Sequence, residues 1–213
     1  MKNIVLALLI AIIACGNLLA QKKDSIPQQD DLLSSLTADT THPLKLLPDH
    51  ILFTQRILWG QKGLMRHYSA FALTPENRAR ELKIRRTMLI CHQSMGALTS
   101  LGMIATGIIG AKLYNGDRSL KDLHGAVATG VDIGYFSTAA FALFAPPKML
   151  DERKGYSSIK VHKWLAVLHM SCMIFTNVVA DQLESNPKLK PWHRAAAYTA
   201  FGAFFVAEGV IKF

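Results

Sequence analysis

The sequence predicts an all-α membrane protein in which four helices run up and down through a lipid bilayer. Two observations indicate this fold. The 213 residues are 50% hydrophobic and only 18% charged, which is more apolar than an ordinary soluble domain. The charges are also unevenly spread, since residues 21–86 are polar whereas long stretches after residue 86 carry no charge. We therefore expect the uncharged stretches to lie in lipid.

The first twenty residues have the parts of a secretory signal peptide. A basic start precedes an apolar run that ends at Ala20, a small residue of the kind found before a cleavage site. Two alternatives stay open: Ile12-Ile13-Ala14-Cys15 is a lipobox that would leave a lipidated Cys15, or the segment is retained as an anchor helix. All three indicate a bacterial envelope protein, and we expect a multi-pass protein of the inner membrane.

Residues 21–74 are expected to form an extension with no site of its own. Up to residue 48 the chain has little periodic apolar pattern and many turn formers, which predicts a tether. Residues 49–70 mix apolar and basic side chains and include Trp59 and Tyr68, two aromatic types favoured at membrane interfaces. This composition predicts a helix that lies on the membrane surface.

Residues 75–213 form the predicted core. Thr74-Pro75-Glu76 supplies a helix cap, a proline suited to the first helical position and an early acid. The helix that starts here continues into 25 uncharged residues, 87–111, enough to cross about 30 Å of hydrocarbon at about 1.5 Å per residue. Three further spans are predicted over 123–147, 164–180 with a polar turn from Ser158, and 195–213. Short connections between them favour antiparallel neighbours.

Charge and cysteine usage exclude several functions. The net charge of +9 does not indicate nucleic acid, because the basic residues lie mainly beside apolar segments, where they anchor helices at the membrane interface. Membrane lipid is therefore the expected partner. Three cysteines without a C-x-x-C or C-x-x-C-H motif exclude a disulfide scaffold, a thiolate zinc site and covalently attached haem.

Each predicted span opens with a histidine. In an up-down bundle the first and third spans start on one side of the membrane, and the second and fourth start on the other. His92 should then face His162 or His169, and His124 should face His193. His162 and His169 are seven residues apart and share a helix face. Matching depth along the helices favours His169, whereas staggered or tilted helices would favour His162.

Two imidazoles per site suit haem better than zinc. Zinc takes three or four protein ligands, and no Cys, Asp or Glu completes such a set in this sequence. Haem iron is already held by four porphyrin nitrogens, so two imidazoles on facing helices fill its axial positions. We expect two non-covalent haem b groups, held by members of one set: His92, His124, His162, His169 and His193.

This pattern resembles the four-helix core of the cytochrome b561 family of transmembrane di-haem electron carriers. The segments HGAVATG at His124 and HRAAAYTAFG at His193 are similar to helix starts of that family, in which small residues follow a histidine. The resemblance covers 87–213 and leaves 21–86 unmatched. It implies two bis-His haems and electron passage between a reductant and an acceptor on opposite membrane faces. A quinone or a soluble protein would be the redox partner of such a membrane oxidoreductase.

Two carboxylates lie inside the predicted spans. Asp132 and Glu208 are costly in lipid unless they are paired, protonated or directed into a wet interior. Both are candidates for a proton or quinone site, and a hydrogen bond between helices explains either one equally well. The alternative function, which uses the histidines and acids only for helix contacts, is a haem-free scaffold subunit or a small transporter.

Two signals for membrane orientation disagree. A cleaved signal peptide places the His92 side outside the cytoplasm, yet that side carries more basic residues, which the positive-inside rule places in the cytoplasm. We expect the first orientation, because the first apolar segment usually sets the topology. The sequence leaves open whether the chain forms a homodimer or belongs to a larger complex.

Overall fold

The computed structural model of the chain describes residues 45–149 and 155–211, and in these residues all regular structure is helical. The chain divides into two compact units. The first unit comprises Met1–Ser94 and Ala139–Glu152, and the second comprises Met95–Thr138 and Arg153–Phe213. The predicted signal peptide, the Cys15 lipobox and residues 21–44 of the predicted tether lie outside the described residues.

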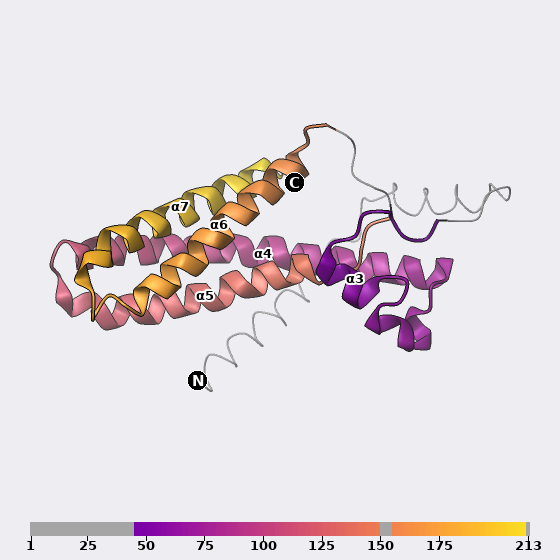
Figure 1. The fold of residues 1–213 in the computed structure, drawn as a ribbon, viewed down its shortest axis with the longest axis horizontal. Coiled ribbons are helices and arrows are strands. Elements are labelled where there is room, and N and C mark those ends of the chain that lie inside the picture. The colour runs from indigo at the N-terminus through magenta and orange to yellow at the C-terminus, as the bar shows by residue number, and fades with distance from the viewer. Residues whose placement is uncertain (1–44, 150–154, 212–213) are drawn as a thin grey trace. The chain divides into compact units, whose positions relative to one another are not determined.

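Helix α4 (Pro75–Tyr114) has 40 residues and contributes to both units (Figure 1). It starts where the sequence predicts, because Thr74 Oγ1 accepts a hydrogen bond of 3.3 Å from the backbone N–H of Asn77 and Pro75 takes the first helical position. The charged first turns then continue without a break into the uncharged stretch 87–111. The predicted helix start is therefore confirmed.

The first unit begins with helix α3 (Phe53–Trp59) and two 3-10 turns, η1 (Leu64–His67) and η2 (Ser69–Phe71). The helix predicted in 49–70 is therefore limited to Phe53–Trp59, and the prediction was wrong in its extent. A Cβ on Gly60 would lie 2.5 Å from the carbonyl oxygen of Arg56, and a Cβ on Gly63 would lie 2.5 Å from that of Leu58. The chain folds back on itself at these glycines, and a continuous helix has no such close approach.

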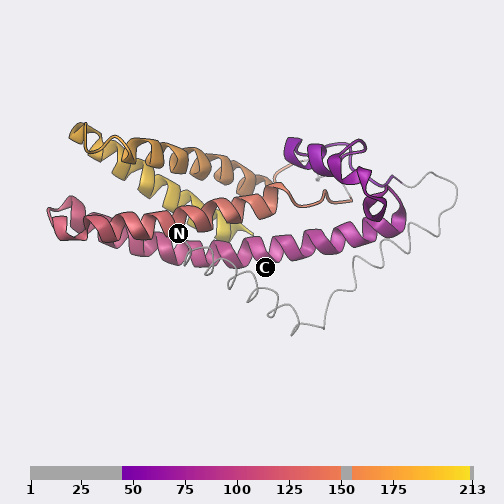
Figure 2. The same cartoon turned by 90° about the horizontal axis from the view of Figure 1, so that it is seen from below.

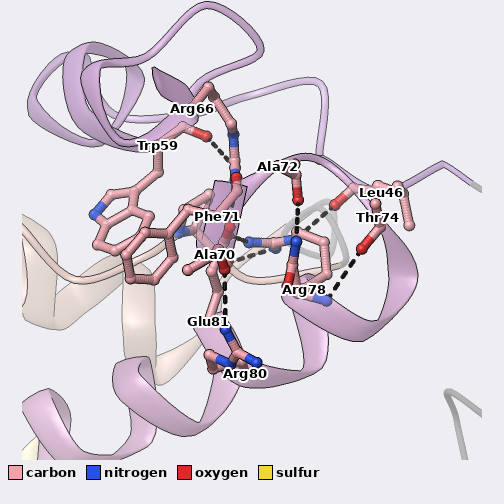
Figure 3. A network of polar contacts seen from close by, with 12 residues as sticks. Leu46, Trp59, Arg66, Ala70, Phe71, Ala72, Thr74, Arg78, Arg80 and Glu81 are labelled. Atoms are coloured by element: carbon pink, nitrogen blue, oxygen red, sulfur yellow. Dashed lines mark hydrogen bonds and ion pairs between the residues drawn. The ribbon is translucent and has the colours of Figure 1, made fainter. Parts of the chain in front are cut away.

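A buried ion-pair network fastens the first unit around the start of α4 (Figure 3). Glu81 pairs with Arg66 and with Arg78, and both Glu81 and Arg78 are fully buried. Arg78 also donates hydrogen bonds of 2.9 Å to the carbonyl oxygens of Leu46 and Pro147. A buried guanidinium needs acceptors for its N–H groups. The last residues of the predicted tether are therefore bound to α4, contrary to the prediction.

The remaining helices follow the predicted spans with shifted ends. Helix α5 (Lys121–Leu143), preceded by η3 (Arg118–Leu120), ends before Pro146 and Pro147, so the last residues of the predicted span 123–147 are not helical. Helix α6 (Ser158–Ala180) starts at Ser158 as predicted, with Ser157 as its N-cap. Helix α7 (Lys190–Val210) follows η4 (Pro187–Leu189) and starts five residues before the predicted fourth span.

Three helical segments of the described chain are long and apolar enough to cross a membrane: Pro75–Tyr114, Arg118–Leu143 and Ser158–Ala180. These are the proportions of a multi-pass membrane protein. Helix α7 was predicted as a fourth span and is not among the three. Lys190, Arg194 and Glu208 leave it an uncharged stretch of only 195–207.

In the second unit α6 and α7 lie side by side and antiparallel (Figures 1 and 2). His162 near the start of α6 contacts Ala207 near the end of α7, while Thr176 near the end of α6 contacts His193 near the start of α7. Helices α4, α5, α6 and α7 all contribute to one apolar core in this unit. Its buried members are Met103, Val131, Tyr135, Met173, Ala200 and Phe204.

Candidate functional site

His124 is the fourth residue of α5 and its imidazole packs on Gly110 of α4. The ring is half-buried. A Cβ on Gly110 would lie 2.9 Å from Cε1 and 3.3 Å from Nδ1 of His124, so that only glycine leaves room for the ring in this position. The backbone of Thr106 forms a hydrogen bond with the imidazole. Nδ1 itself is buried and has no hydrogen-bond partner among the described residues.

His193 is the fourth residue of α7 and is oriented by α6. Its Nδ1 lies 3.1 Å from the carbonyl oxygen of Thr176. A carbonyl oxygen only accepts hydrogen bonds, so Nδ1 carries the proton and Nε2 keeps its lone pair. His193 is also close enough to His124 for the charges of the two imidazoles to interact. The pairing of His124 with His193 as ligands stays a prediction from the sequence.

The two candidate histidines of α6 have different surroundings. Nδ1 of His162 lies 2.9 Å from the carbonyl oxygen of Ala207, which repeats the arrangement of His193. His169 is buried, and its Nδ1 shares a hydrogen bond with the hydroxyl of Tyr135. The His169 ring also packs edge-on against Tyr135 and Phe204, with centroids 5.6 and 5.1 Å away. His169 therefore forms part of the core, whereas His162 directs Nδ1 at the backbone of α7.

The second predicted pair is divided between the two units. His92 belongs to the first unit, whereas His162 and His169 belong to the second. The pairing of His92 stays a prediction from the sequence.

Both predicted intramembrane acids contact a neighbouring helix. Asp132 Oδ1 accepts a hydrogen bond of 3.1 Å from the amide of Asn177 on α6. Glu208 Oε2 accepts one of 2.6 Å from the hydroxyl of Ser100 on α4. Its other oxygen, Oε1, is buried without a donor in the described part of the chain, and a Cβ on Gly96 would lie 2.9 Å from it. Glu208 therefore keeps one acceptor free, and Asp132 is joined to α6.

Tyr135 is the residue of this region that sequence reasoning missed. It is 1% exposed and lies between His169 and Phe204 in the core. A buried tyrosine hydroxyl needs a hydrogen-bond partner, so a tyrosine in the middle of a predicted apolar span was a signal for a polar contact between helices. The sequence carries no signal for which helix supplies that partner.

A bare metal ion and haem need different numbers of protein donors. The described residues contain no group of three or more His, Cys, Asp and Glu side chains that could hold a metal ion. Axial ligation of haem needs only two imidazoles. His124 and His193 fit this requirement, because one presents a buried nitrogen without a partner and the other has Nδ1 engaged and Nε2 available.

The protein is therefore an all-helical chain with three helices of membrane-spanning length. Two of its histidines, His124 and His193, lie near helix starts. No protein-family model, no curated protein and no solved structure matches the chain. Its function is therefore inferred from its own residues.

Proposed function

We propose that the protein is a membrane electron carrier that binds haem b between histidines of neighbouring helices. The observations that carry this proposal are the bond from His193 Nδ1 to the Thr176 carbonyl and the buried Nδ1 of His124, which has no partner among the described residues. Histidines that ligate a metal usually donate their other ring N–H to a carbonyl or carboxylate, which fixes the tautomer and the ring orientation. His193 has this arrangement, and the buried Nδ1 of His124 has no hydrogen-bond partner among the described residues.

Haem would supply a one-electron couple at this site, where His124 and His193 would hold it. The residues of the chain would hold the rings in place. The carbonyl of Thr176 orients His193, and Gly110 allows the His124 ring to lie directly against α4.

The wider architecture belongs to the same proposal. Helix α7 is the fourth span of an up-down bundle, with Lys190 and Arg194 directed to one membrane surface, as long basic side chains do at helix ends. The shared core and the antiparallel α6–α7 contacts support this arrangement. A second haem b, held by other histidines of the predicted set, would complete an electron path across the inner membrane. A quinol or a soluble protein would be the redox partner.

The test is the visible spectrum and the haem content of the purified protein. We expect a reduced b-type α-band and about two haems per chain, because each haem takes two of the histidines. Replacing His193 by alanine should leave about one haem per chain, and so should His124→Ala. The control is His67→Ala, which changes an exposed histidine outside the predicted pairs.

Two outcomes would contradict the proposal in different ways. A chain that is purified without haem and does not take up added haem would refute the function. A haem content that is the same in the wild type, His124→Ala and His193→Ala would refute the site while leaving a haem protein.

One observation favours the haem-free alternative. The His169 ring is engaged by Tyr135 and Phe204 in the core, which is how a histidine that only packs helices together behaves. If no haem binds, a scaffold subunit or a small transporter built on such contacts is the function that remains to be tested.

A further inference from the structure

Helix α3 is tied to the C-terminal end of α5 within the first unit. Thr54 Oγ1 donates a hydrogen bond of 2.7 Å to the carbonyl oxygen of Leu143, and Trp59 Nε1 donates one of 2.9 Å to that of Phe144. Leu143 is the last residue of α5, and the final carbonyls of a helix have no partner inside it. Helix α3 therefore caps α5 and lies at the level where α5 ends.

This level coincides with the end of the uncharged part of α4. The Arg85 guanidinium donates a hydrogen bond of 2.7 Å to the carbonyl oxygen of Pro146, just beyond α5. The uncharged stretch of α4 begins at Thr87, two residues after Arg85. If α4 and α5 cross a membrane, the cap formed by α3 is therefore at the bilayer surface.

One edge of α3 is apolar and exposed. Phe53 has 74% of its surface exposed, and Ile57, one turn later, has 45%. Residues four apart lie on the same helix face, and Leu52 beside Phe53 is also 45% exposed. Such a face is costly in water and is typical of short segments that lie in the interface of a bilayer.

The charges around this apolar edge favour its binding to a membrane surface that contains anionic lipids. Exposed basic residues of the first unit outnumber its exposed acids in the described residues, and Arg56 lies on α3 itself between Phe53 and Ile57. The exposed basic residues beyond α3 are Lys45, Lys62, Arg80, Lys83 and Arg86, and the exposed acids are Asp49 and Glu76. Basic residues close to a membrane are attracted by anionic lipid headgroups.

We propose that α3 is an interfacial anchor that lies in the bilayer surface, with Phe53 and Ile57 among the upper acyl chains and Arg56 at anionic headgroups. Its occupant is lipid rather than another protein, because the hydrogen bonds to Leu143 and Phe144 keep this face at the membrane boundary. The anchor does not depend on haem. The anchor would fix the depth of the α5 end and of the Arg78–Glu81 pair relative to the bilayer surface.

The experiment uses the full chain in bilayers that contain an anionic lipid. Spin labels are attached to Phe53→Cys or Ile57→Cys, in a background where the three native cysteines, Cys15, Cys91 and Cys172, are serine. Collisions with oxygen, which concentrates in lipid, are compared with collisions with a water-soluble nickel complex. The matched control is Glu76→Cys, an exposed site on α4 about 16 Å before the uncharged stretch at about 1.5 Å per residue.

We expect the oxygen-to-nickel collision ratio at positions 53 and 57 to be several-fold higher than at position 76. Adding Arg56→Glu should lower the ratio at position 57 in anionic bilayers and leave it nearly unchanged in zwitterionic ones. Equal ratios at positions 53 and 76 would overturn the proposal. Magnetic coupling between labels at position 53 of two chains would also overturn it, since a second copy would then cover this face.

Discussion

The His124 ring lies directly on the backbone of Gly110, where a Cβ would be 2.9 Å from the ring carbon Cε1. Gly107, almost one turn earlier on α4, differs: among the described residues nothing lies within 4 Å of a Cβ placed there. The two glycines share a helix and an uncharged stretch, so they separate the effect of a methyl group on the helix from its effect on the histidine.

We expect Gly110→Ala to displace His124 and to reduce the haem content by about one haem per chain, since one axial ligand is lost. Gly107→Ala should keep the haem and change thermal stability by no more than about 1 kcal/mol, in the stabilising direction, because alanine is the better helix former. Haem quantification and thermal unfolding in detergent measure both effects. Equal haem contents in the two variants would show that the packing of His124 on Gly110 is not needed for haem binding.

Single replacements can show which histidine of α6, His162 or His169, holds the proposed second haem. His162 and His193 both direct Nδ1 at a backbone carbonyl of the partner helix, whereas His169 uses Nδ1 for Tyr135. On this basis we expect His162→Ala to remove one haem, and His169→Ala to keep both haems while lowering thermal stability. The opposite result would make His169 the ligand, as the depth comparison from the sequence favours. Tyr135→Phe is the control, because it removes only the hydroxyl partner of His169.

Ser100 supplies the hydrogen bond that Glu208 has in the described structure. Ser100→Ala would leave the half-buried carboxyl group of Glu208 without a hydrogen-bond donor among the described residues, and we expect a loss of about 1–3 kcal/mol of stability. Ser171→Ala is the matched control, since the Ser171 hydroxyl is exposed and bonds the Val167 carbonyl of its own helix. Thermal unfolding followed by circular dichroism should show a lower midpoint for Ser100→Ala alone. Identical unfolding midpoints would mean that the Ser100–Glu208 hydrogen bond contributes nothing to the thermal stability of the protein.

The first unit should depend strongly on Glu81. Glu81→Ala leaves Arg66 and Arg78 buried without their shared carboxylate, and removing one partner of a buried ion pair costs about 3–5 kcal/mol. We expect faster amide exchange and faster tryptic cleavage at Arg56 and Lys62 in the variant. Glu76→Ala, at an exposed position in the first turn of α4, is the control. If both variants are cleaved at the wild-type rate, the network does not hold the unit together.

Local signals predict several helix starts well. Thr74 and Pro75 begin α4 and Ser158 begins α6 in both the prediction and the structure, because caps and proline preferences involve neighbours within one turn. Four spans are predicted from apolar length, and three of them correspond to helices that are long and apolar enough to cross a membrane. The break at Gly60 and Gly63 was missed, since a mixed apolar and basic pattern is the same for a helix and for a compact turn.

The sequence by itself determined where the apolar spans run and which histidine lies near the start of each span, because both properties depend on neighbouring residues. Only the tertiary structure decided that His124 rests on Gly110 and that His193 is held by Thr176. It also joined Arg78 to carbonyls 32 and 69 residues away. These contacts link separate segments, and their geometry depends on how side chains of several helices fill one interior. The pattern along one helix leaves that packing undetermined.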